Sequence, residues 1–246
     1  MTDKTLHIQL KNLYCHRRST TGDPYIWTIF FKVDNHSLTI SPEFQLIGSA
    51  ALTLSTDGHS NLGQMPSGGT GKVRIPTRVG TWESGALKKL WVPHFEQPIV
   101  WLGGAVFVVL EHHNLSQAGC VAAHEALNKY AAKITAEIIR DFDPTCIQLL
   151  DFMASIKTYF ADAFRKKLTG IEDIIIDAVK NNQSILQNLW TLAHRDELIG
   201  YDFQIFTNFG FEDEANIEQR FEFSERWTTE KSDWEIFGEA YLEDMG

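Results

Sequence analysis

The densest group of metal-ligating side chains in the sequence is Glu111-His112-His113, which follows an apolar run. Imidazole nitrogens and carboxylate oxygens are zinc ligands, and His16 or His94 could complete such a set. Successive side chains of an extended strand point to opposite faces, however, so His112 and His113 cannot readily share one ion. We therefore expect histidines of a loop or a solvated surface here rather than a zinc site.

A second candidate is the pair Cys120 and His124, whose spacing of four places both side chains on one face of a helix. Nine histidines in the chain make such a spacing expected by chance. His124-Glu125 has no second histidine four residues on, so the zinc-protease pattern fails. The Gly-x-Ser-x-Gly elbow and the kinase signatures do not occur. The sequence predicts a protein that is not an enzyme.

The segment 55–71 is rich in Gly and Ser and suggests a phosphate-binding loop. It has neither the Gly-Lys-Ser/Thr ending nor the strand-to-helix setting that cradles a phosphate. The segment predicts a mobile surface loop instead.

The segment Lys88-Lys-Leu-Trp-Val-Pro-His-Phe95 mixes cations with aromatic residues. Two interpretations are open: a patch that lies at a membrane interface, or buried aromatic rings with solvated lysines. We favour the second, because aromatic side chains supply much of a protein core.

The net charge of −10 is concentrated at one end of the sequence. Residues 1–116 carry a net charge of +2 and residues 117–195 are neutral, whereas residues 196–246 hold three basic against fifteen acidic residues, a net −12. A region this acidic argues against nucleic-acid binding. It also repels an anionic membrane unless it faces away or cations intervene.

Length and composition predict a globular chain with a large core, since 43% of the 246 residues are hydrophobic. Three cysteines without close spacing indicate a reduced compartment. The sequence opens without a secretory signal pattern, and it contains no run of about 18 apolar residues. We expect a cytoplasmic protein, or one peripheral to a membrane; its oligomeric state is left open.

Alternating or continuous apolar patterns predict β-strands on both sides of a central segment. The predicted strands cover residues 6–10, 25–33, 72–76, 80–82, 104–110, 198–206, 217–223 and 233–242, with two short strands between 37 and 54. Residues 14–23 are polar and predict a loop. The strands at 217–223 and 233–242 are each expected to bury one face and to expose a glutamate-rich one.

The central segment changes to a period of 3.6 residues and predicts three amphipathic helices, over about residues 120–142, 145–168 and 171–193. Asp143-Pro144 separates the first two helices, and Thr169-Gly170 ends the second. Because strand patterns resume afterwards, we predict an α+β fold. An antiparallel β-sandwich (residues 1–116 and 195–246) carries an inserted three-helix subdomain (residues 117–194).

Two separated stretches resemble the C-two family, the calcium-dependent phospholipid-binding β-sandwich of protein kinase C and synaptotagmin. The first runs from Leu6 through Asp23-Pro24-Tyr25 to Phe31, and the second combines Val106–Glu111 with Arg195–Tyr201. Both occur in the order found in that family, but roughly eighty residues of helical sequence stand where the family has a short loop.

The resemblance implies a calcium site between loops at one end of the sandwich. Asp23 matches the aspartate of the Asp-Pro-Tyr triplet, Glu111 and His113 fall where two aspartates are usual, and Asp196 matches the acid before Ile199-Gly200. The match is partial, because a histidine nitrogen is a poor calcium ligand. Two interpretations stay open: weak calcium binding, and a calcium-free sandwich.

The sequence therefore predicts a non-enzymatic binding module that docks on membrane phospholipid or on a protein partner, weakly dependent on calcium. In one alternative, the helical insertion is membrane-active and opens to form a pore or effector element, since alanines along its helices permit close contact. In another, the chain is a structural subunit of a larger assembly.

Overall fold

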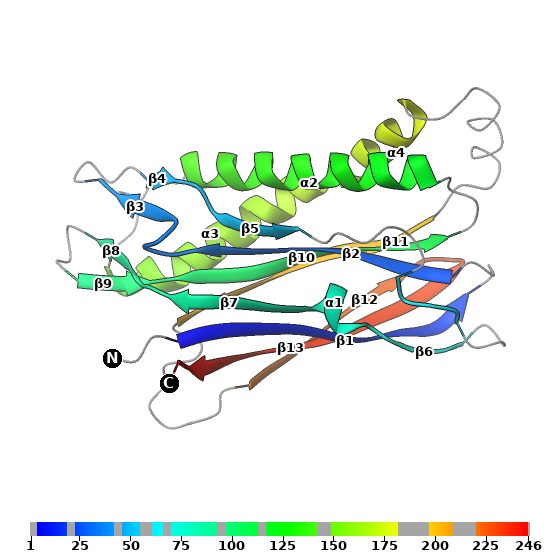
Figure 1. Cartoon of the computed structure of the whole chain (residues 1–246), viewed down its shortest axis with the longest axis horizontal. Helices are drawn as coiled ribbons and strands as arrows, with labels where there is room; N and C mark the ends of the chain where they lie inside the picture. Colours follow the sequence, from blue (N-terminus) through cyan, green and yellow to red (C-terminus); the bar gives the residue numbers. More distant parts are fainter. Residues whose placement is uncertain are drawn as a thin grey trace.

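Most of the chain lies in two antiparallel sheets and three long helices, and the fold is α+β (Figure 1). The computed structural model describes residues 4–18, 23–41, 46–54, 61–65, 70–92, 97–112, 117–141, 149–181, 197–208 and 220–245.

The first sheet is built around β1, with the strand order β12-β13-β1-β6 and with β7 also paired to β1. Its strands are β1 (Lys4–Arg18), β6 (Gly71–Arg74), β7 (Thr81–Leu87), β12 (Arg220–Thr228) and β13 (Ser232–Asp244). β13 accompanies β1 along its whole length. β6 and β7 follow one another along the other side of β1, and the short helix α1 (Thr77–Gly80) joins them.

The second sheet has the order β11-β10-β2-β5. Its strands are β2 (Asp23–Val33), β5 (Ala51–Leu54), β10 (Leu102–His112) and β11 (Glu197–Thr207). β10 precedes the helices and β11 follows them. The two strands nevertheless pair, from Leu102 opposite Thr207 to Glu111 opposite Glu197. The sequences on the two sides of the helical segment therefore share one sheet.

Two hairpins project from one end of the sheets, where β2 ends and β10 begins (Figure 1). One consists of β3 (Leu38–Ile40) and β4 (Leu46–Gly48), and the other of β8 (Leu90–Val92) and β9 (Gln97–Val100). At the opposite end of the sheets, β1 and β10 finish and β2 starts.

Three helices form a layer over the outer face of the second sheet (Figure 1). They are α2 (Gln117–Arg140), α3 (Leu149–Leu168) and α4 (Ile171–Asn181). Between α2 and α3, the Lys167 ammonium donates a hydrogen bond to Glu137 Oε2 at 2.6 Å, which holds the pKa of Glu137 below its usual value.

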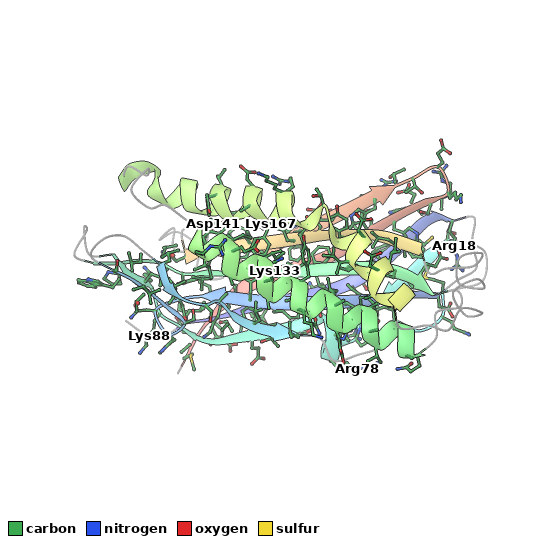
Figure 2. The ribbon with its side chains drawn as sticks, turned by 90° about the horizontal axis from the view of Figure 1, so that it is seen from above. Arg18, Arg78, Lys88, Lys133, Asp141 and Lys167 are labelled. Atoms are coloured by element: carbon green, nitrogen blue, oxygen red, sulfur yellow. The ribbon has the colours of Figure 1, made fainter. Side chains whose placement is uncertain are left out.

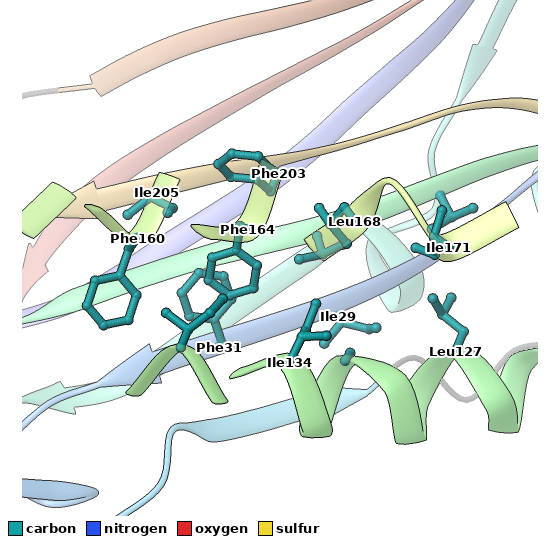
Figure 3. Close-up of a cluster of buried hydrophobic side chains, with 14 of the residues drawn as sticks. Ile29, Phe31, Leu127, Ile134, Phe160, Phe164, Leu168, Ile171, Phe203 and Ile205 are labelled. Atoms are coloured by element: carbon teal, nitrogen blue, oxygen red, sulfur yellow. The ribbon is translucent and has the colours of Figure 1, made fainter. Parts of the chain in front are cut away.

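The second sheet is buried on both faces, because alternate side chains of its strands enter two different cores. Ile26 and Phe107 pack with the first sheet. Ile29 and Phe31 face the other way and pack against the helices, where the Phe31 and Phe164 rings stack at 5.1 Å (Figure 3). Burial on both faces explains why the sequence of β10 is a continuous apolar run instead of an alternating one.

Where their side chains are described, the helices turn apolar side chains toward this second core. Those buried there include Leu127, Ile134, Ile138, Phe160, Phe164, Leu168 and Ile171. Each large side chain withdrawn from water in this way contributes about 1.5–3 kcal/mol. A Cβ on Gly104 would lie 2.5 Å from Phe31 Cζ, so only glycine lets the strand pass that ring.

Three predictions about local structure were wrong. Residues 14–18 belong to β1 and are not a loop, since β13 pairs with β1 as far as Arg18–Ser232. β12 has no fully buried residue, although one face was expected to be buried; it lies at the end of its sheet. Within 55–71, Asn61 is buried and bonds both backbone groups of Ile26, at 3.0 and 2.6 Å.

The bounds of the first helix differ from prediction. α2 begins at Gln117, three residues before the predicted 120, and ends at Arg140, two residues before the predicted 142. Residues 142–148 and 182–196 lie outside the described part of the chain. The start of the second helix at 145 and the end of the third helix at 193 therefore stay predictions.

Candidate functional site

Asp23 and Glu111, two of the four predicted calcium ligands, lie at the same end of the second sheet. Asp23 is the first residue of β2 and pairs with His112, while Glu111 pairs with the neighbouring Pro24. The pairing arises because β2 starts where β10 finishes. The other two predicted ligands, His113 and Asp196, lie outside the described residues.

Both carboxylates already have partners within the fold. Asp23 Oδ1 accepts a hydrogen bond from the backbone N–H of Met65 at 3.2 Å. Glu111 is 1% exposed, and its Oε1 lies 3.8 Å from Nη1 of Arg18, whose side chain is also buried. The guanidinium supplies the positive charge that a buried carboxylate requires. We name this region the Arg18–Glu111 end.

The low polarity of the Arg18–Glu111 end also affects Cys15, on the strand that delivers Arg18. Burial raises the pKa of the Cys15 thiol, Arg18 lowers it, and Glu111 raises it. The net direction is upward, so the thiol is protonated at neutral pH. A protonated thiol is neither a strong nucleophile nor a metal ligand.

The histidine and cysteine candidates are engaged elsewhere. His16 Nε2 lies 2.9 Å from Glu235 Oε2 on the first sheet, and the His124 ring lies 5.3 Å from Trp27. Cys120 is fully buried in the core beneath the helices. Among the described residues, no three His, Cys, Asp or Glu side chains gather closely enough to hold a metal ion.

The hairpin end, formed by β3–β4 and β8–β9, has a different character. Ile47 on β4 is 58% exposed and Trp91 on β8 is 48% exposed. Their neighbours Ile40 and Leu90 are buried in one core, which joins both hairpins to the second sheet. Strand alternation therefore turns Leu90 inward and Trp91 outward.

The segment 88–95 has features of both sequence interpretations. Leu90 belongs to the core, as we favoured, whereas Trp91 reaches solvent beside two lysines. Lys88 is exposed and Lys89 is half-buried. Figure 2 shows Lys88 and Arg18 at opposite ends of the molecule. Residues 93–96 lie outside the described part of the chain.

A buried aspartate fixes the turn beneath the hairpin end. Asp34 is 0% exposed, and its Oδ1 accepts the backbone N–H groups of His36 and Ser37, each at 3.2 Å. Its Oδ2 lies 3.5 Å from Lys32 Nζ. The backbone N–H of Asn35 donates to the carbonyl of Lys88 at 2.9 Å, which ties the turn to β8. The hairpin end is therefore held by specific hydrogen bonds.

No protein-family model matches the chain, and neither the curated proteins nor the solved structures contain a match. None of the described helices combines the length and apolar character needed to cross a membrane.

Proposed function

We propose that the protein is a non-enzymatic binding module that docks on an anionic membrane surface through its hairpin end. The observation that supports this proposal is the exposure of Trp91 and Ile47 on neighbouring hairpins next to Lys88 and Lys89. A sandwich of the C-two-like kind is part of the proposal, supported by the two antiparallel sheets.

The chemistry of these side chains suits the boundary between lipid headgroups and acyl chains. A tryptophan ring is apolar along its body and carries one N–H donor, so it is stable where one side is dry and the other wet. A lysine near an anionic leaflet contributes about 1 kcal/mol. Two lysines and two apolar side chains are few anchors, so we expect reversible, salt-sensitive binding.

The proposal predicts that vesicles of phosphatidylcholine mixed with phosphatidylserine sediment the protein, and that vesicles of phosphatidylcholine alone do so poorly. Trp91→Ala should weaken sedimentation by about tenfold, as expected for loss of an inserted aromatic side chain. Lys88→Glu with Lys89→Glu should remove the dependence on phosphatidylserine and on salt.

The matched control is Val121→Ala, which removes a side chain of 44% exposure from α2, away from the hairpins. It should bind vesicles like the unmodified protein. Equal sedimentation of the Trp91→Ala variant and the unmodified protein would contradict the proposal. So would binding that Val121→Ala weakens as strongly as Trp91→Ala does.

Calcium dependence remains a separate proposal about the opposite end of the sandwich. Calcium at about 100 times its dissociation constant would add near 2.7 kcal/mol to the free energy of unfolding, which is seen as a raised midpoint. If Asp23 is a ligand, the rise disappears in Asp23→Asn and Asp196→Asn. A midpoint unaffected by millimolar calcium would leave Asp23 and Glu111 with structural roles only.

A further inference from the structure

Two adjoining cavities of about 450 and 340 Å³ lie between helix α3 and the strands β11 and β12. Both are lined by Arg165, Asp202, Phe203 and Glu225. β11 and β12 are the last strands of their respective sheets, so the cavities follow the line where two open sheet edges meet beneath a helix. We call this hollow the edge groove.

Two carboxyl groups from different sheets meet in the edge groove. Asp202 of β11 and Glu225 of β12 both line the two cavities, and Gln204 Nε2 donates to Glu225 Oε1 at 2.9 Å. Desolvation and the neighbouring Asp202 raise the pKa of Glu225 from 4.5 to about 7, while Gln204 and Arg165 oppose the rise. Near neutral pH Glu225 is therefore partly protonated.

Two arginines of the groove wall are matched to other acids, and Lys157 lines the smaller cavity as a third cation. Arg226 makes two hydrogen bonds with the carboxylate of Asp233, at 2.8 and 2.7 Å. Arg165 donates to Asp162 at 2.9 Å from the same helix. None of the ion pairs formed among the described residues includes Asp202 or Glu225. The carboxyl pair and Lys157 are thus the charges of the groove that form no ion pair among the described residues.

Aromatic rings stand beside the carboxyl pair. Trp227 and Tyr201 line the larger cavity. The Trp227 ring is held in place, because a Cβ on Gly200 would lie 2.3 Å from its Cγ, and its edge meets Phe107 at 6.2 Å between ring centroids. An ammonium or guanidinium group is attracted both to carboxylates and to the faces of such rings.

We propose that the edge groove binds a lysine or arginine side chain from a segment of a partner protein. The carboxyl pair supplies the counter-charge, and Trp227 and Tyr201 supply the aromatic wall. The net charge of −12 over residues 196–246 attracts a basic segment from a distance. The inference is independent of membrane docking, since its residues lie on β11, β12 and α3 and not on the hairpins.

Binding of a cation favours the ionised form of Glu225 and so releases its proton. The other charged groups facing Glu225 are Lys157 and Arg165 of α3, Asp202 of β11, and Arg226 with its partner Asp233. We therefore expect affinity for a basic segment to rise from pH 6 to pH 8.

The test uses the full chain and a capped tetra-lysine peptide, with capped tetra-glutamate as the opposite charge. Titration calorimetry should detect tetra-lysine and not tetra-glutamate, and the measured heat should reveal proton release in buffers that differ in ionisation enthalpy. The double variant Asp202→Asn with Glu225→Gln should weaken tetra-lysine binding by about tenfold or more.

The control is Glu222→Gln, which removes the same charge from β12 at an exposed residue that does not line the cavities. Equal loss of binding in this variant would show attraction to net charge alone and would overturn the proposal, as would the absence of tetra-lysine binding. If the double variant does not fold, the indole N–H resonance of Trp227 in the unmodified protein decides. It should shift with tetra-lysine, and an unmoved resonance refutes the site.

Discussion

The Arg18–Glu111 end and the edge groove each withdraw a glutamate from solvent, but they give it opposite neighbours. Glu111 lies beside a guanidinium. Glu225 lies beside a second carboxyl group, which raises its pKa to about 7. The first charge is balanced inside the fold, and the second is balanced only by a proton or by something that binds. The contrast separates a structural carboxylate from one available to a ligand.

Removing the guanidinium should have the largest effect on this contrast. Arg18→Met leaves Glu111 buried without its cation, and loss of one partner of a buried ion pair lowers the free energy of unfolding by about 3–5 kcal/mol. Urea unfolding at pH 7 measures the loss. Adding Glu111→Gln should restore much of it, whereas Arg17→Met, at an exposed neighbour, should change little. An equal loss of unfolding free energy in Arg17→Met and Arg18→Met would show that Arg18 does not stabilise Glu111 as a structural carboxylate.

A change of intermediate size is expected from the pH dependence of Glu225. Its pKa is raised on folding from 4.5 to about 7, so its contribution to stability is complete below about pH 4.5 and is lost as the pH rises through 7. Glu225→Gln should flatten the fall in unfolding free energy between pH 5 and pH 8 by about 1 kcal/mol after allowance for solvent screening. The control Glu222→Gln should keep the fall, and the same slope in both variants would contradict the shifted pKa.

The smallest effect concerns the surface pair Arg226 and Asp233, whose side chains are 53% and 14% exposed. Hydrogen bonds from Arg226 hold the pKa of Asp233 at about 2. In Arg226→Gln this pKa should return toward its usual value of about 3.9, as followed by NMR titration of the Asp233 carboxyl carbon. The melting midpoint at pH 7 should hardly move. A marked fall of the melting midpoint would show that this surface ion pair stabilises the fold as strongly as the buried Arg18–Glu111 pair.

The elements with strong patterns were predictable from the sequence. The apolar run 104–110 became β10, buried on both faces, and the stripe containing Leu127 and Ile134 became the inner face of α2. The extension of β1 through Arg18 could not be predicted from the neighbouring sequence. Its polar residues are ordered by pairing with residues more than two hundred positions away, such as Asp233 opposite Arg17.

The sites were less predictable than the fold. Asp23 and Glu111 lie together at one end of the second sheet, but the partner of Glu111 is an arginine in a segment that was predicted to be a loop. The approach of Asp202 to Glu225 depends on two edge strands from different sheets. Alternation predicts which face of a strand is buried, and it carries no information about which edges will meet.

The pairing of β1 with β13 also bears on the order in which the chain folds. β1 is synthesised first and β13 after every other described strand, yet β13 is its partner along its whole length. The second sheet and its helices can assemble earlier, because their strands and helices all precede β12. One edge of β1 must wait for this distant partner, and pairing across so long a separation slows folding and leaves that edge open while the chain emerges from the ribosome.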